Sequence, residues 1–262
     1  MEIFDEDIAW LRGFIEAKRS QGRAVRLLDS GEEDQRHPDF SEKERATIVL
    51  NEDTWLELGN PSTISTALAL VTQNIDLIND GAITLIGPDI PEARGSLAFA
   101  QILLISSDKL QDEDYRRINS LQYQLELKGY MIKTVPSSLT IWSRVSKDSA
   151  AEGLCFGILG RAIMESYKSK FTIPSIEIVF VTSSREDVEE LDDLHQKVKR
   201  IVKAMNKMME EMSFDCSSCE YLDVCGDVRQ LGALRERLMR EKSMGDQGKT
   251  GARVDGLRNE QP

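Results

Sequence analysis

Apolar residues near the start of the chain recur with helical spacing. Over residues 3–17 they return every three or four positions, as they do on one face of an amphipathic helix. We therefore predict an N-terminal amphipathic helix within residues 1–29. Residues 30–45 are rich in charged side chains and contain Pro38, a pattern typical of a solvated linker.

Short apolar runs, separated by turn residues, follow the linker and predict strands. The expected strands cover residues 47–50, 55–58, 67–71, 82–86 and 102–105. Asp80-Gly81 is a favourable pair for a tight turn before the fourth of these strands.

The second half of the chain alternates between helical and extended patterns. It predicts a helix over residues 112–128 that Gly129 ends, a strand over 139–145, a helix over 150–170 and a strand over 176–182. Ser183, followed by Glu186, matches a capping box and predicts that a long charged helix begins there and runs to about residue 212.

This order of elements predicts an α+β fold. We expect a mixed α/β domain over residues 46–212 and a C-terminal helical segment with a cysteine motif over residues 213–244. The polar, glycine-rich residues 245–262 are expected to form a disordered tail.

Charge and composition exclude several classes of function. The formal net charge is −12, which argues against a nucleic-acid partner because binding to phosphates requires clustered Lys and Arg. The chain starts without the pattern of a signal peptide, and no apolar run approaches the ~20 residues that a membrane span requires. We therefore expect a cytoplasmic protein without a membrane span.

Three of the four cysteines form a C-x2-C-x5-C motif, which predicts a metal centre at Cys216, Cys219 and Cys225. The two-residue gap lets two thiolates reach one centre, and the third returns after a short loop. Three thiolates suit a [4Fe–4S] cluster with one iron open to another ligand, whereas structural zinc usually takes four ligands. Zinc, or no metal at all, remains the alternative.

Other residues are weaker candidates for chemistry. The fourth cluster ligand could be solvent, Asp215, Glu220, Asp223 or a side chain of a partner. Cys155 is expected to be a small core residue on an apolar helix, and His195 to be solvated on the charged helix. Gly157 to Arg161 predicts close helix packing rather than a phosphate-binding turn. The motifs assign no catalytic residue.

Several segments, in this order, resemble the acetyl-CoA synthase beta subunit of carbon monoxide dehydrogenase complexes. They are Leu56-Glu-Leu-Gly-Asn-Pro61, Ile83-Thr-Leu-Ile-Gly-Pro-Asp-Ile90, Gly95-Ser96, Arg144-Val-Ser-Lys147 and Glu177-Ile-Val-Phe-Val-Thr182. The resemblance covers about residues 47–226. It implies a middle α+β domain, followed by a catalytic domain whose cubane cluster is bridged to two nickel ions and which assembles acetyl-CoA.

The resemblance also implies which cysteines would bind the cluster, and it shows which metal ligands of the family have no counterpart in this chain. Cys216 and Cys219 match the first two cluster cysteines of the family, and Cys225 matches the third, although the family has a longer gap before it. The fourth cluster cysteine and the Cys-Gly-Cys that holds the distal nickel have no counterpart. We therefore expect a truncated, divergent relative, in which nickel is not expected.

These observations lead to one hypothesis about function and two alternatives. The hypothesis is an iron–sulfur protein with an accessory or electron-handling role in anaerobic one-carbon and acetyl-CoA metabolism, bound to a protein partner in a carbon monoxide dehydrogenase-type complex. The first alternative is a docking module without redox chemistry, with zinc or no metal. The second is a partial acetyl-CoA synthase subunit that another chain completes, which would bring nickel as well as iron.

Overall fold

The computed structural model describes residues 3–28, 48–107, 112–125, 127–133, 141–210, 220–221, 233, 236–237 and 240. The chain divides into two compact units, Met1–Lys199 and Arg200–Pro262, and each is treated by itself below. The first unit contains both sheets of the described chain.

The larger sheet, sheet A, has five strands in the order β1-β4-β9-β6-β3. Their bounds are β1 Val25–Leu28, β3 Ser65–Thr72, β4 Ile83–Ile86, β6 Phe99–Ser106 and β9 Ser175–Val181. The pairs β3·β6 and β4·β9 are parallel, whereas β6·β9 and β1·β4 are antiparallel. Every residue of β3, β4, β6 and β9 is buried, as expected for strands that are covered on both faces.

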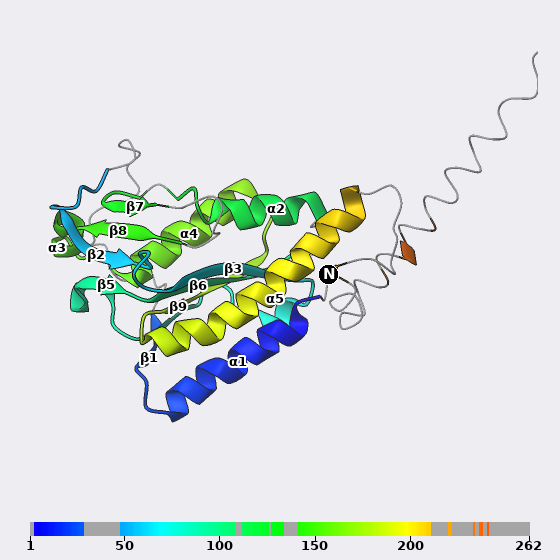
Figure 1. The fold of residues 1–262 in the computed structure, drawn as a ribbon, viewed down its shortest axis with the longest axis horizontal. Helices are drawn as coiled ribbons and strands as arrows, with labels where there is room; N and C mark the ends of the chain where they lie inside the picture. The colour runs from blue at the N-terminus through cyan, green and yellow to red at the C-terminus, as the bar shows by residue number, and fades with distance from the viewer. Residues whose placement is uncertain are drawn as a thin grey trace, which may run out of the picture. The chain divides into compact units, whose positions relative to one another are not determined.

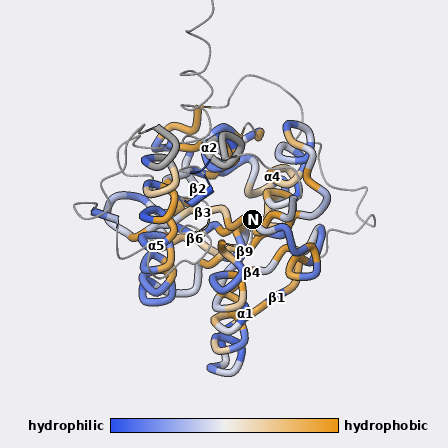
Figure 2. Tube along the Cα trace, turned by 90° about the vertical axis from the view of Figure 1, so that its right-hand side faces the viewer, coloured by the Kyte–Doolittle hydropathy of each residue, from blue (hydrophilic) through white to orange (hydrophobic). Residues whose placement is uncertain are grey.

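Helices cover sheet A on both sides (Figure 1). Helix α1 (Asp5–Ser20) and residues 185–199 of α5 (Arg185–Glu210) lie on one face, and α2 (Asp112–Leu121) and α4 (Phe156–Lys170) lie on the other. The ring of Phe156 at the start of α4 packs 4.7 Å from Phe180 and 5.9 Å from Phe99, measured between centroids. The hydropathy colours alternate along α1 and α5, as expected of helices with one apolar face (Figure 2).

The smaller sheet, sheet B, has four strands in the order β5-β2-β8-β7. Their bounds are β2 Thr54–Leu58, β5 Gly95–Leu97, β7 Tyr130–Ile132 and β8 Ser143–Ser146, and the short helix α3 (Lys147–Ala151) follows β8. Two short 3-10 helices, η1 (Ile75–Leu77) and η2 (Ile90–Glu92), flank β4. One side of sheet B is buried, and the alternate positions Glu57 and Arg144 are charged and only partly buried.

The predicted α+β fold is confirmed over the described residues. The N-terminal helix, the strands predicted at 55–58, 67–71, 82–86, 102–105 and 176–182, and the long charged helix are all present. The turn at Asp80-Gly81 is also present, since Gly81 has a φ of 78° and the N–H of Ala82 donates to the carbonyl of Asn79 at 3.0 Å. Gly160 confirms close helix packing, because a Cβ there would lie 2.9 Å from Ile83 Cδ1.

Other predicted elements were wrong in extent. Residues 48–50 form no strand, and the strand expected from residue 139 begins at Ser143. The helix expected over 112–128 ends at Leu121, and Gly129, with a φ of 70°, lies in the turn before β7 instead of ending a helix. Gly153 divides the helix expected over 150–170 into α3 and α4, because its φ of 97° lies outside the range of a right-handed helix.

Three short strands, β1, β5 and β7, were missed, and β1 lies within the range predicted as helix. They have only three or four residues each, too few to show a period. The predicted linker, cysteine motif and tail lie almost entirely outside the described residues, so the proposed domain boundaries stay predictions. In the part of the chain that is described, no helix is long and apolar enough to cross a membrane.

Candidate functional site

The predicted metal centre falls on positions that the structure does not describe. These positions are Cys216, Cys219, Cys225 and the candidate fourth ligands Asp215 and Asp223. Glu220 is described, and it is exposed in a turn with Tyr221. Within the described residues, no group of three or more His, Cys, Asp or Glu side chains could hold a metal ion. The three-cysteine centre therefore stays a prediction.

Segments that carry the family resemblance meet on one side of sheet B. Glu57 in β2 pairs in register with Ser96 in β5 on one side and with Arg144 in β8 on the other. Arg144 pairs in turn with Met131 in β7. Because side chains alternate along a strand, these four form one row on the side away from the buried residues. We call this row, Ser96, Glu57, Arg144 and Met131, the outer face of sheet B.

Asn60 ties the turn after β2 to this outer face. Its side-chain nitrogen donates to Glu57 Oε2 and to Ser96 Oγ, in both cases at 2.8 Å. Gly59 before it has a φ of 68°, and a Cβ at this position would lie 2.5 Å from the carbonyl oxygen of Ile141. A glycine is thus required at this turn. The turn places Asn60 beside β2 and β5.

Glu57 and Arg144 form the central ion pair of the outer face. Arg144 Nε donates to Glu57 Oε1 at 2.6 Å, and the two side chains are 13% and 15% exposed. Burial alone would raise the pKa of Glu57, but the hydrogen bonds from Asn60 and Arg144 outweigh it and lower this pKa below its usual value. Glu57 is therefore ionised at neutral pH.

Two tryptophans beside this pair carry stacked cations, one of which is Arg144 itself. Lys133 Nζ lies 4.0 Å from the ring centroid of Trp142, and the guanidinium of Arg144 lies 5.7 Å from it. At the β5 side, the guanidinium of Arg94 lies 4.3 Å from the ring of Trp55. Tryptophan and arginine are enriched where protein surfaces meet, so this composition suits a protein contact.

A second carboxylate, Glu177, lies in sheet A and is almost fully buried. Arg12 of α1 donates to both of its oxygens, at 2.5 and 2.6 Å, and the N–H of Asn79 donates to Oε2 at 2.9 Å. The side chains of Glu177 and Arg12 are 1% and 32% exposed. A buried carboxylate with this many donors stabilises the fold only while its arginine is present.

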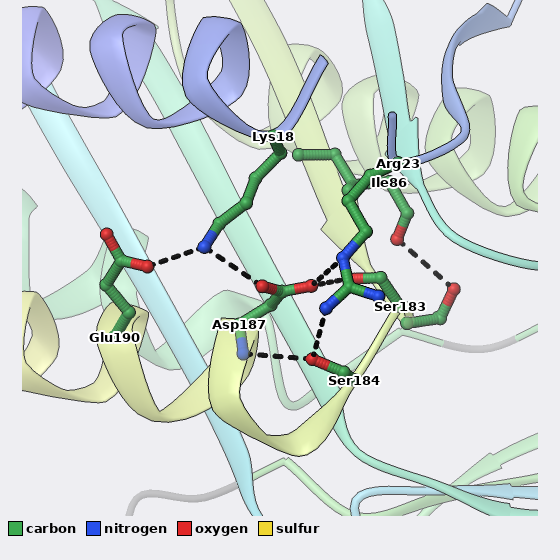
Figure 3. Close-up of polar contacts among 8 residues, drawn as sticks. Lys18, Arg23, Ile86, Ser183, Ser184, Asp187 and Glu190 are labelled. Carbon is green, nitrogen blue, oxygen red and sulfur yellow. Dashed lines mark hydrogen bonds and ion pairs between the residues drawn. The ribbon is translucent and has the colours of Figure 1, made fainter. Parts of the chain in front are cut away.

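The start of α5 carries a third cluster of charges (Figure 3). Asp187 accepts from Lys18 at 2.9 Å and from Arg23 at 3.3 Å, and Ser183 Oγ lies 2.5 Å from Asp187 Oδ2. The residue that caps the helix is Ser184 and not Ser183 as predicted, since its Oγ accepts from the N–H of Asp187 at 3.3 Å. This cluster holds α1 against α5 and places no reactive group in solvent.

His195 was expected to be solvated, and this was wrong. The residue is only 6% exposed, because it lies on the side of α5 that faces β3. Its Nδ1 lies 2.6 Å from Thr66 Oγ1 and 3.6 Å from Asp192 Oδ1. The neighbouring ring of His195 lowers the pKa of Asp192. His195 is therefore a partnered residue of the fold.

Cys155 lies at the N-cap of α4 and not within an apolar helix as predicted. It is a free thiol and half-buried. Burial raises the pKa of this thiol, which opposes formation of a thiolate ligand.

Sequence reasoning quoted Glu57, Asn60 and Arg144 only for their family resemblance and assigned them no role. The signal that could have found them is the alternation within β2, where Glu57 lies between the buried Leu56 and Leu58. Their meeting across three strands depends on sheet pairing, which no local pattern reveals.

Comparison with known proteins gives a consistent picture. Residues 39–188, more than half of the chain, match the family model of the CO dehydrogenase/acetyl-CoA synthase complex beta subunit. Acetyl-CoA decarbonylase/synthase complex subunit beta 1 of Methanosarcina thermophila is 24% identical over 180 residues, which cover 66% of this chain and 38% of that protein. The beta subunit of Archaeoglobus fulgidus is 26% identical over 221 residues, with 79% and 41% covered. The chain thus spans about two-fifths of the length of these relatives.

Proposed function

Because the chain belongs to the family of the CO dehydrogenase/acetyl-CoA synthase complex beta subunit, we propose that it is an iron–sulfur protein with an accessory or electron-handling role in one-carbon metabolism. The observation that carries this proposal is the position of the C-x2-C-x5-C motif, which follows soon after the matched domain and its long helix. Cys216, Cys219 and Cys225 would hold a [4Fe–4S] cluster.

The donor set fits such a cluster. Three thiolates hold three irons of a cubane and leave the fourth iron open to another ligand, whereas a structural zinc site of this kind would lack one ligand. When bound, the cluster would supply one-electron transfer. The half-buried thiol of Cys155, with its raised pKa, is a poor fourth ligand, so a carboxylate, solvent or a partner would complete the site.

The relatives are named as subunits of an enzyme complex, which supports a protein partner for this chain as well. The outer face of sheet B is the proposed docking surface, since Ser96 is exposed there and cations stacked on tryptophans lie beside the Glu57–Arg144 pair. The expected setting is a cytoplasmic complex of one-carbon chemistry.

The test is metal and acid-labile sulfide analysis of the full chain, purified without oxygen. We expect about four irons and four sulfides per chain, lost in Cys219→Ser and retained in Cys155→Ser. Stoichiometric zinc without sulfide would replace this proposal with the docking module. Nickel together with iron in the assembled complex would instead indicate a synthase subunit completed by another chain.

A further inference from the structure

The outer face of sheet B is rich in hydrogen-bond donors and poor in free acceptors. Its carboxylate, Glu57, is engaged at both oxygens, since Arg144 donates to Oε1 at 2.6 Å and Asn60 donates to Oε2 at 2.8 Å. Arg144 also donates to Asn51 Oδ1 at 3.2 Å, and its remaining N–H groups have no hydrogen-bond partner among the described residues. A molecule that binds this face must therefore supply acceptors.

A cation without an ion pair lies at the β7 end of this face. Lys133 follows β7 two positions after Met131, so its side chain points to the same side of the sheet. Its Nζ lies 4.0 Å from the ring of Trp142, and no carboxylate in the described part of the chain forms an ion pair with it. Although the whole chain has a formal charge of −12, this face presents positive charge that is not neutralised. Such a surface is complementary to an acidic ligand.

Two exposed apolar side chains border these donors. The N–H of Val49 donates to Met131 Sδ at 3.4 Å, which holds this segment against the outer face. Val49 is 2% exposed, whereas Ile48 and Leu50 on either side of it are 75% and 50% exposed. Large exposed apolar side chains next to Trp, Met and Arg are typical of a surface that another protein covers.

The width of the face also favours a protein over a small anion. Neighbouring strands are about 4.8 Å apart, so the row from Ser96 in β5 to Met131 in β7 covers roughly 14 Å across the four strands. An inorganic anion would reach only part of this row and would leave Ile48 and Leu50 in water.

We propose that the outer face of sheet B binds an acidic and partly apolar segment of a partner protein. Carboxylates of that segment accept hydrogen bonds from Lys133 and Arg144, and its apolar side chains cover Ile48 and Leu50. This inference rests on the protein partner of the proposed function and adds the chemistry by which that partner is recognised. It does not depend on the metal at the cysteines.

The experiment uses the full chain, tagged and expressed in its native cells, and purified together with the proteins bound to it. A carbodiimide then joins lysine amines to carboxylates in direct contact, and mass spectrometry identifies the linked residues. We expect Lys133 to be linked to an aspartate or glutamate of another protein. Lys133→Arg should retain that protein without this link, because arginine keeps the positive charge but lacks the lysine amine.

Two further variants measure how much the charge and the apolar border contribute. Lys133→Glu reverses the charge and Ile48→Asp charges the border, so each should lower the amount of the linked protein retained roughly tenfold. Lys170→Glu is the matched control, since Lys170 is an exposed cation of the same unit and forms no ion pair among the described residues. Circular dichroism checks folding, and Ile48→Asp keeps the test valid if Lys133→Glu does not fold.

Wild-type retention by both Lys133→Glu and Ile48→Asp would overturn the inference. Links from Lys133 only to residues of this chain would do so too, because they would indicate an internal contact or a second copy. A wild-type chain that retains no protein would overturn both the inference and the docking role. Iron analysis of the same preparations tests the cluster separately, because a metal-free chain linked to a partner through Lys133 would remove the cluster and leave this inference standing.

Discussion

Each of the two sheets carries a carboxylate held by an arginine, and the two pairs differ in where the arginine comes from. In sheet A, Glu177 is held by Arg12, which lies 165 positions away in the N-terminal helix. In sheet B, Glu57 is held by Arg144 of the adjacent strand. Glu177 is 1% exposed and Glu57 15%.

The two pairs differ in which member is more buried, since the carboxylate is more buried in sheet A, whereas the arginine is more buried in sheet B, with Arg12 32% and Arg144 13% exposed. Arg12 lies outside the family match, which begins at residue 39, so the buried carboxylate of sheet A depends on a segment that the family model does not include. The pair in sheet B lies within the match and beside stacked tryptophans and cations. The carboxylate of the first pair lies in the core, whereas the second pair lies in the outer face of sheet B.

The largest effect is expected from removing the arginine of sheet A. Arg12→Met would leave the carboxylate of Glu177 buried without its cation, so we expect the free energy of unfolding to fall by about 3 kcal/mol. Urea denaturation followed by circular dichroism measures this. Arg19→Met is the control, because Arg19 forms an exposed pair with Glu16 on the same helix, and it should cost less than about 0.5 kcal/mol.

The long strands of sheet A could be predicted because β3, β6 and β9 each contain a continuous apolar run, ALALV, ILLI and IVFV respectively. Strands β5 and β7 could not, since each has three residues and is defined by its neighbours in sheet B. The two arginine–carboxylate pairs could not be predicted either, because no local sequence pattern links their members. Arg12 and Glu177, for example, lie 165 positions apart. The burial of His195 was missed because a charged helix gave no sign that one polar residue faced the sheet.

A smaller effect is expected from removing the arginine of sheet B. Arg144→Met should lower the free energy of unfolding by only about 1 kcal/mol, because water can still reach Glu57 and Asn60 still donates to it. Lys128→Met, in an exposed pair with Glu152, is the control and should change stability by less than about 0.5 kcal/mol. Equal losses for Arg12→Met and Arg144→Met would contradict the distinction between the two pairs.

The smallest effect is the dependence of stability on pH through Glu57. Its pKa is lowered in the folded chain from an ordinary value of 4.5, so its contribution to stability is fully present above that value and is lost as the pH falls through the folded pKa. The stability difference between the wild type and Glu57→Gln should therefore be larger at pH 7 than at acidic pH below 4.5. Arg144→Met should show part of the same change, because Arg144 supplies one of the hydrogen bonds that lower this pKa. A difference that stays constant with pH in Glu57→Gln would show that the pair does not hold Glu57 in its ionised form.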